Sequence, residues 1–513
     1  MAWINVNADP SRILEVDTAF NDEWKTWSTE STPPYGAFDV QSVMLHEFGH
    51  WLQLWHSAAI TQGQTPIVMQ PTILPAGVGE SGLRRNLSPD DIDGAKAIYN
   101  FIGWAGARIT YNAGWSVEPA IAVTHDDFSS RNDIAEENNV HLVWSDNSAG
   151  KYRICYRRHI LGGNNTVPWQ PVIGLNWPSG DVGSGVPDIA VATIASIIYV
   201  HVVWCDDSPG NNEIYYARST NGGSTFSSPV RLTQNQGDSI SPAIAVDNME
   251  RVYVVWMDNN PGILFENPDN YEIYFRMSTD NGATWPTASE MLTDHSDLSG
   301  LTAFSGYPDI AAGSGTNRYV VWRDNRNYLP EGGVPEIYFK KFDGAIWLEE
   351  KRLTTSGGGG CYEPAIAVSR FDDAIHIVYE YQVPGSLNGD IFYLKSTDHG
   401  SSFPYASRIS TTDPISYNAQ ISLGYVYEDE EYHLYVLHVI WQEDYPEGEE
   451  IHYASNKSWE SGWSSLRISY NEKDCYGCSI SAFGYNIHLA WSQEVATESD
   501  TEVHYLRNRA RVE

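Results

Sequence analysis

The chain has 513 residues, and an excess of Asp and Glu over Lys and Arg gives it a formal net charge of −35 at pH 7. Nucleic-acid binding normally needs a basic surface, and an anionic membrane repels a negative one, so this composition argues against both partners. The mean hydropathy is −0.36 and no long apolar run occurs, which predicts no membrane insertion. The length and a change of texture near residue 103 favour two domains, residues 1–103 and 104–513.

A short segment near the N-terminus carries three imidazoles and one carboxylate at spacings that suit a single zinc ion. His46 and His50 are four residues apart and would lie on one face of a helix, so both can bind the same ion. Glu47 stands beside them, where it can take a proton from metal-bound water, and His56 falls where a chain turning back after the helix would supply a third ligand. The segment predicts a metal-dependent hydrolase; a solvated helix with incidental histidines is the alternative interpretation.

The first hundred residues resemble the matrixins, which belong to the metzincin clan of zinc endopeptidases. Residues 46–56 follow the family signature H-E-x-x-H-x-x-G-x-x-H except at Gln53, where the family has glycine. Residues 68–71 resemble the family's methionine turn, and residues 87–94 resemble the start of its C-terminal helix. The resemblance implies an α+β catalytic region with zinc ligands, a general base and a hydrophobic floor under the metal: His46, His50 and His56, then Glu47, then Met69.

The same resemblance implies a protein or peptide substrate, secretion from the cell, and a structural Ca2+ in the peptidase region. It also implies that the domain is incomplete here. The family's first strands and first helix would precede residues 1–6, which are typical of an edge strand that binds substrate by strand addition. We therefore expect weak or no peptidase activity from this chain, even with zinc bound.

Beyond residue 103, a unit of four short strands recurs. Its second strand ends in aliphatic residues followed by Trp, any residue and Asp, and its fourth strand begins with Arg and ends in Leu-Thr or Ile-Ser. The first strand of each copy begins at Pro119, Pro187, Pro242, Pro308, Pro364, Ala419 and Cys478. Seven copies of four strands predict an all-β, seven-bladed β-propeller.

The two ends of this region predict how the ring closes. The last copy stops after residues 503–505 without its fourth strand, whereas an extra fourth strand, residues 107–112, stands before the first copy. We expect strand 107–112 to complete the last blade, because this removes the edges that an open ring would expose.

Three hairpins, residues 219–226, 278–285 and 396–403, resemble the Asp-box or BNR repeats of sialidase-type propellers. In such a turn the Ser and Asp or Asn side chains bind the backbone, glycine takes a positive φ, and the last aromatic packs under the hairpin, so the expected role is structural. Acidic hairpins such as residues 206–213 and 258–262 hold enough oxygen donors for Ca2+. They recur with the blade, which favours turn chemistry over an ion site.

As a whole, the sequence predicts a zinc endopeptidase that hydrolyses peptide bonds through zinc-activated water, joined to a propeller that binds its substrate or a surface. The alternative is an inactive peptidase remnant attached to a propeller that binds glycan or protein. A sialidase-like glycosidase ranks third, because the blade arginines stand at the starts of fourth strands and not in a carboxylate-binding cluster.

Overall fold

The structure is a computed structural model. It describes four short strands before residue 40, and residues 104–509 except 126–136, 161–168, 177–184, 260–269, 296–303, 329–333, 386–388, 411–414, 430–431, 447, 458–461, 470–472, 484–485 and 496–499. The chain divides into two units, Met1–Trp104 and Ala105–Glu513. Within the described residues, no helix has the length and apolar character needed to cross a membrane.

The first unit contains two pairs of short strands. The first pair is antiparallel and the second is parallel: β1 (Ala2–Asn5) with β2 (Glu15–Thr18), and β3 (Trp27–Ser28) with β4 (Phe38–Asp39). The expected active-site helix and the remainder of the α+β region lie outside the described residues.

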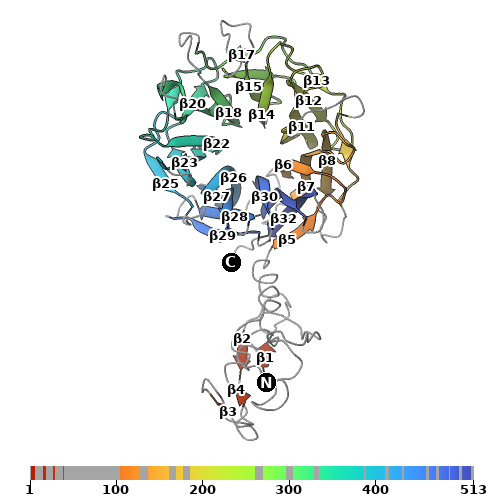
Figure 1. The fold of residues 1–513 in the computed structure, drawn as a ribbon, viewed down its shortest axis with the longest axis vertical. Helices are drawn as coiled ribbons and strands as arrows, with labels where there is room; N and C mark the ends of the chain where they lie inside the picture. The colour runs from red at the N-terminus through yellow and green to blue at the C-terminus, as the bar shows by residue number, and fades with distance from the viewer. Residues whose placement is uncertain are drawn as a thin grey trace. The chain divides into compact units, whose positions relative to one another are not determined.

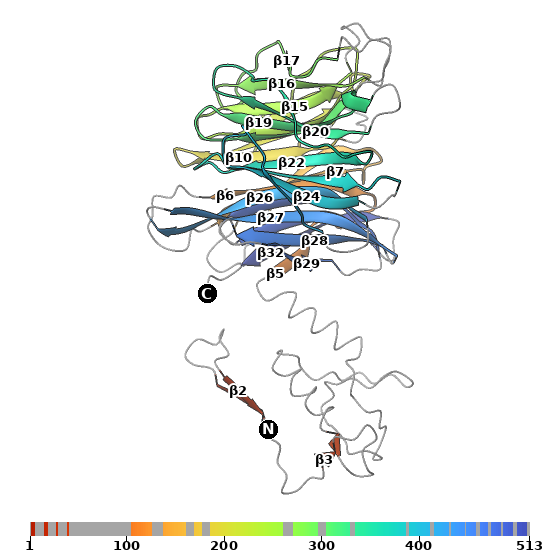
Figure 2. The same ribbon diagram turned by 90° about the vertical axis from the view of Figure 1, so that its left-hand side faces the viewer.

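The second unit is a seven-bladed β-propeller, which confirms the fold predicted from the repeat (Figure 1). Among the described residues each blade is a four-stranded antiparallel sheet, and the first strands of neighbouring blades contact one another around the whole ring. The first strands face the centre of the ring and the fourth strands lie at its rim (Figure 1). In the side view the strands run across the thickness of the ring (Figure 2).

The blades follow one another in chain order. Blade 1 has β6 (Ser116–His125), β7 (Glu137–Asp146), β8 (Arg153–Ile160) and β9 (Ile173–Gly174). Blade 2 has β10 (Asp188–Ile194), β11 (Ile197–Asp206), β12 (Glu213–Ser219) and β13 (Val230–Arg231). Blade 3 has β14 (Ser239–Val246), β15 (Val252–Asp258), β16 (Glu272–Ser278) and β17 (Glu290–Met291). Blade 4 has β18 (Ser305–Ala312), β19 (Arg318–Asp324), the 3-10 turn η1 (Arg326–Tyr328), β20 (Glu336–Phe342) and β21 (Lys351–Arg352).

The remaining three blades complete the ring. Blade 5 has β22 (Gly360–Val368), β23 (Ile375–Gln382), β24 (Gly389–Ser396) and β25 (Tyr405–Arg408). Blade 6 has β26 (Ile415–Asp429), β27 (Tyr432–Tyr445), β28 (Gly448–Lys457) and β29 (Ser464–Arg467). Blade 7 has β30 (Cys475–Phe483), β31 (Asn486–Glu494), β32 (Thr501–Arg509) and, from the other end of the unit, β5 (Trp104–Arg108).

The strand that completes blade 7 begins and ends earlier than the sequence predicts. It ends at Arg108, whose guanidinium lies 2.6 Å from the carboxylate of Glu502. The N–H of Ile109 still donates to the carbonyl of Val503 at 2.8 Å, but the N–H of Val503 donates to the hydroxyl of Thr110 at 2.9 Å. Because a side chain replaces the backbone acceptor there, the chain leaves the ladder, and residues 110–112 are not strand.

In five other blades, a Thr or Ser hydroxyl at the equivalent position ends the fourth strand. A buried backbone N–H of the third strand donates to it at 2.8–3.0 Å: Ile214 to Thr233, Ile273 to Thr293, Ile337 to Thr354, Ile391 to Ser410, and Ile451 to Ser469. The repeated Leu-Thr or Ile-Ser therefore supplies one apolar side chain to the core and one acceptor for a backbone group that would otherwise be buried without a partner.

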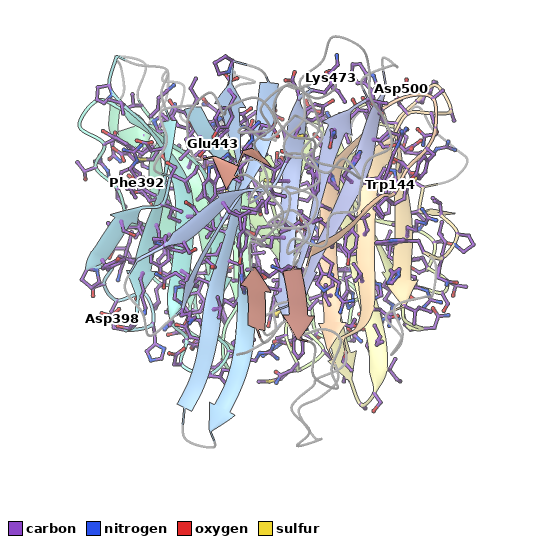
Figure 3. The ribbon with its side chains drawn as sticks, turned by 90° about the horizontal axis from the view of Figure 1, so that it is seen from below. Trp144, Phe392, Asp398, Glu443, Lys473 and Asp500 are labelled. Carbon is purple, nitrogen blue, oxygen red and sulfur yellow. The ribbon has the colours of Figure 1, made fainter. Side chains whose placement is uncertain are left out.

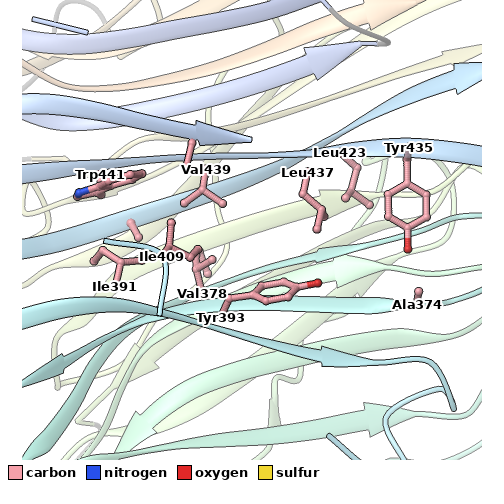
Figure 4. Packing of buried hydrophobic residues seen from close by; sticks show 13 residues of the cluster. Ala374, Val378, Ile391, Tyr393, Ile409, Leu423, Tyr435, Leu437, Val439 and Trp441 are labelled. Atoms are coloured by element: carbon pink, nitrogen blue, oxygen red, sulfur yellow. The ribbon is translucent and has the colours of Figure 1, made fainter. Parts of the chain in front are cut away.

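The hydrophobic core lies in layers between neighbouring blades. Between blades 5 and 6, Val378, Ile391 and Tyr393 pack against Leu437 and Val439 (Figure 4). The tryptophans of the second strands are at most 1% exposed in five blades: Trp144, Trp204, Trp256, Trp322 and Trp441. Each sheet is covered on both faces by another blade, which explains why these strands are almost continuously apolar.

Aromatic side chains join neighbouring blades at six interfaces among the described residues. A ring that follows the third strand of one blade packs edge-on against a third-strand ring of the preceding blade, with centroids 4.7–5.3 Å apart: Phe226 on Tyr156, Trp285 on Tyr216, Trp347 on Phe275, Phe403 on Phe339, Trp463 on Tyr393, and Trp169 on Tyr505. Such pairs contribute roughly 0.5–1.5 kcal/mol each beyond the area they bury. The described residues hold no such pair between blades 6 and 7.

The three predicted hairpins supply the turns that carry half of these rings. In each, the Ser hydroxyl accepts the N–H of the fourth residue on, at 2.9 Å: Ser219 from Gly223, Ser278 from Gly282, and Ser396 from Gly400. Figure 3 shows Asp398, in the third hairpin, at the opposite end of the sheets from Glu443. We call the face that carries Glu443, where each first strand begins and each second strand ends, the upper face.

Side chains of the first strands also tie neighbouring blades together near the centre of the ring. The carboxylate of Asp188 accepts the N–H of Ile244 in the next blade at 2.8 Å, and that of Asp309 accepts the N–H of Ile366 at 2.8 Å. The hydroxyl of Ser479 accepts an N–H of blade 1 in the same way at 3.2 Å. These side chains satisfy N–H groups on the inner edge of each sheet, which has no further strand to pair with.

Replacing Asp309 by serine should remove a pH-dependent loss of stability. Burial raises the pKa of Asp309 to about 7, so the folded protein holds a proton that the unfolded chain releases near pH 4. Its contribution to stability is therefore fully present below about pH 4 and is lost as the pH rises through about 7. Serine keeps a hydroxyl acceptor, as Ser479 does in blade 7, and does not titrate.

Denaturant unfolding of the parent and Asp309→Ser at about pH 6 and about pH 8.5 checks this, because titrating groups that do not interact with Asp309 cancel in the difference. The difference in free energy of unfolding should shift in favour of the variant at the higher pH. A difference that stays constant would contradict the role given to Asp309.

Candidate functional site

The predicted zinc ligands and their neighbours lie outside the described residues: His46, Glu47, His50, His56 and Met69. Their donor set, three imidazoles with one carboxylate, is one that Zn2+ accepts in catalytic sites. In the part of the chain that the structure describes, no group of three or more His, Cys, Asp or Glu side chains is placed to hold a metal ion.

Five buried histidines of the propeller have a structural role. Each stands on a second strand, and its Nδ1 lies 2.6–2.7 Å from a tyrosine hydroxyl on the third strand of the same blade: His141 and Tyr156, His201 and Tyr216, His376 and Tyr393, His438 and Tyr453, and His488 and Tyr505. Burial lowers the pKa of His141, His201 and His376 to about 3, so these rings are neutral at physiological pH. Their imidazoles belong to the blade framework.

The arginines at the starts of the fourth strands pair within their own blades. Each guanidinium lies 2.6–2.8 Å from a buried glutamate that begins the third strand: Arg231 with Glu213, Arg352 with Glu336, and Arg467 with Glu450. Arg108 and Glu502 form the same pair in blade 7. These arginines therefore hold strands together and do not converge on one ligand.

The acidic hairpins use their oxygens in turns. The carboxylate of Asp206 accepts the N–H of Ser208 at 2.9 Å. The carboxylate of Asp258 accepts hydrogen bonds from Asn235, Ser239 and Trp256 at 2.7–3.0 Å. These contacts are turn chemistry at Asp206 and Asp258, and within the described residues no group of side chains is placed to hold Ca2+.

The upper face is shaped by bulges at the starts of the first strands. In six blades the register shifts there, and one residue at the bulge has a positive φ: Glu118, Ser241, Tyr307, Glu363, Asn418 and Gly477. A bulge re-aims the side chain of its extra residue and is common beside functional sites. In four of these blades proline follows, at a position where no ladder N–H is needed.

Between blades 4 and 5 lies a group of side chains that we call the Arg323 cluster: Arg323, Tyr307 and Tyr362, with Glu363 and Glu380 near enough to interact electrostatically with Arg323. The guanidinium carbon of Arg323 lies 4.2 Å from the ring centre of Tyr307 and 5.7 Å from that of Tyr362. Tyr362 and Glu380 are directly opposite each other in the β22–β23 ladder, and Glu363 occupies the adjacent bulge.

The two carboxyls of this cluster are perturbed. Burial raises the pKa of Glu380 to about 7, and Glu363 raises it further while Arg323 lowers it. Burial likewise raises the pKa of Glu363, against a lowering by Arg323. A cluster with one guanidinium, two carboxyls whose pKa values are raised and two phenol rings can both donate and accept hydrogen bonds. Perturbed groups of this kind gather at functional sites.

The sequence contains a signal for this cluster that the motif analysis missed. Arg323 occupies the variable position between Trp and Asp at the end of a second strand, and Glu363 and Tyr307 precede the proline of a first strand. Both positions recur seven times, and the structure places them on the upper face. A comparison of these two positions in all seven blades would have identified blades 4 and 5, the neighbouring blades that both carry a charged residue there.

The comparisons with known proteins divide at the same place as the chain. Residues 7–100 match the family model described as matrixin. Matrix metalloproteinase-25 of Mus musculus is 40% identical over 83 residues, which cover 16% of this chain and 12% of that protein. Metalloendoproteinase 1 of Glycine max is 38% identical over 80 residues, covering 15% of this chain and 23% of that protein. The chain thus spans less than a quarter of the length of either relative.

The solved structures resemble the propeller. An ulvan lyase of a polysaccharide lyase family has a TM-score of 0.51 and 12% identity, covering 77% of this chain and 95% of its own. The polysaccharide lyase Uly1 has a TM-score of 0.52 and 8% identity, covering 78% and 92%. At such identities the likeness concerns the fold alone. The chain therefore has a segment that matches the matrixin family model, residues 7–100, followed by a seven-bladed β-propeller.

Proposed function

We propose that this chain is a secreted zinc-dependent endopeptidase whose propeller binds the substrate or the surface on which it acts. The matrixin match carries this proposal, because residues 7–100 include the whole of the predicted metal-binding segment, residues 46–56. A protein or peptide substrate follows from the same match. The fit of three imidazoles and one carboxylate to catalytic zinc is the supporting chemical argument.

In this proposal His46, His50 and His56 would hold the zinc, and Met69 would supply the hydrophobic floor of the site. A zinc ion held there would supply Lewis-acid chemistry, polarising the peptide carbonyl and lowering the pKa of a water to about 7. Glu47 would act as general base toward the attacking water and then as proton donor to the amine that leaves the cleaved peptide bond.

A propeller that binds glycan or protein, with an inactive peptidase segment, is the second candidate. Gln53 favours it, because the family has glycine there and a Cβ costs roughly 1–2 kcal/mol where a turn needs positive φ. A sialidase-type glycosidase is the third candidate. The pairing of the fourth-strand arginines with glutamates of their own blades gives it no support.

Purified protein should carry about one zinc ion per chain. His50→Ala should lose it, because the two remaining histidines bind the ion poorly. Elemental analysis of the parent and the variant, purified without chelator and shown to be folded by circular dichroism, measures this. A folded parent without zinc, or a variant that retains the parent's zinc, would refute the site.

A further inference from the structure

A second site, on the propeller, goes beyond the proposed peptidase activity. We propose that the Arg323 cluster binds an acidic saccharide, with Arg323 receiving the carboxylate of one sugar unit and Tyr307 and Tyr362 packing against its ring.

The first argument concerns the Nε of Arg323. The side chain of Arg323 is only partly buried, but its Nε is buried and has no hydrogen-bond partner in the described part of the propeller. The fourth-strand arginines, by contrast, each reach a carboxylate at 2.6–2.8 Å. A buried N–H without an acceptor is costly, so a ligand that brings a planar oxyanion would relieve that cost and match the guanidinium with two parallel hydrogen bonds.

The second argument is that aromatic rings hold the guanidinium in place. Phe304 and Tyr307 lie 4.9 Å and 4.2 Å from it, and Tyr362 lies 5.7 Å away. The cation is thereby fixed before a ligand arrives, which reduces the entropy lost on binding. Tyr307 is 39% exposed, so part of its ring remains free to pack against the apolar face of a sugar.

The third argument is that the two glutamates complement a carboxylate when they are protonated. Glu363 of β22 and Arg323 of β19 are the charged groups that act on Glu380, and Tyr362 of β22 is the neighbouring phenol. With a pKa of about 7, Glu380 carries a proton in mildly acidic solution and then adds no negative charge near Arg323. Ionised, it would repel the carboxylate of the ligand.

A saccharide fits this face better than an acidic peptide. The bulge positions of the adjacent blades 3 and 6 carry neutral polar groups, Ser241 and Asn418, which suit hydroxyl groups. The chain's net charge of −35 opposes a ligand with a dense run of carboxylates. A saccharide with one carboxylate among its hydroxyl groups and ring carbons suits the neutral polar groups and carries little negative charge.

Calorimetric titration of the full chain with a glucuronic acid disaccharide, its neutral glucose counterpart and an aspartate-rich peptide tests the proposal. At about pH 6 the acidic disaccharide should bind, and the neutral one should bind about tenfold more weakly or not at all. Arg323→Gln and Tyr307→Ala should each weaken binding. Zinc removal with a chelator should have no effect, so failure here and failure of the peptidase proposal are distinguishable.

The pH dependence separates direct binding from a structural effect. The affinity of the parent should fall between about pH 6 and about pH 8.5 as Glu380 ionises. Glu380→Gln carries no charge at either pH, so its affinity should fall less than that of the parent over the same pH range. If Arg323→Gln does not fold, Tyr307→Ala and this pH comparison decide. Equal binding of the acidic and neutral disaccharides, tighter binding of the peptide, or unchanged binding in Tyr307→Ala would overturn the proposal.

Discussion

Replacing Glu47 by alanine should leave zinc bound while lowering the rate of peptide hydrolysis by roughly 10²–10⁴-fold, because proton transfer is lost and the three histidine ligands remain. A quenched fluorescent peptide reports the rate, and elemental analysis of the same samples reports the metal.

The histidine variant provides the control for this experiment. His50→Ala should lose both zinc and hydrolysis, whereas Glu47→Ala should lose hydrolysis alone. Equal rates in Glu47→Ala and the parent would refute the role of Glu47 as the base. A zinc-loaded parent without measurable hydrolysis would favour the binding propeller with an inactive peptidase segment.

Replacing Gly282 by alanine should destabilise the propeller by about 3 kcal/mol, the sum of two costs. Gly282 has a φ of +72°, and a Cβ there would lie 1.8 Å from the hydroxyl oxygen of Tyr216 in the preceding blade. The left-handed backbone costs roughly 1–2 kcal/mol for alanine, and overpacking at a blade interface costs roughly 1–3 kcal/mol.

A second glycine separates these two costs. Gly385 has a φ of +71°, and a Cβ there would meet nothing within 4 Å. Gly385→Ala should therefore show the backbone cost alone when both variants and the parent are unfolded in guanidinium chloride. If the two substitutions lower the free energy of unfolding equally, the close approach between hairpin and neighbouring blade does not contribute to stability.

The fold of the propeller could be predicted because its strands are buried on both faces. Continuous apolar runs that end in Trp144, Trp204 or Trp256 leave a clear pattern, and the pattern repeats once per blade. The bounds of the closing strand could not be predicted, because they depend on the hydroxyl of Thr110, which replaces a backbone acceptor in the folded blade.

Only half of the aromatic contacts between blades could be predicted from the sequence. Phe226, Trp285 and Phe403 end recognisable hairpins, whereas Trp169, Trp347 and Trp463 make the same contact from hairpins without that signature. An edge-on ring contact needs only an aromatic side chain at the correct place after the third strand. The sequence around it is free to vary, so no motif marks it.

The candidate sites differ in the same way. The metal ligands His46, His50 and His56 could be predicted because one helix and one turn determine their spacing, although their placement lies outside the described residues. The Arg323 cluster was missed, because Arg323 and Glu363 come from different blades and only a comparison of equivalent positions in all blades relates them.

The closing strand also sets when this protein can finish folding. Arg108 and Glu502 are 394 positions apart, so the ribosome makes the fourth strand of blade 7 first and its partners last. Until β32 has left the ribosome, β5 has no neighbour to pair with, and the loop to be closed is nearly as long as the propeller itself. Contacts of such separation form slowly, so the six other blades have time to assemble while the ring stays open. Completion of the propeller therefore waits until the last of its strands has been made, and chains that stall before residue 501 retain an exposed strand edge through which they can aggregate.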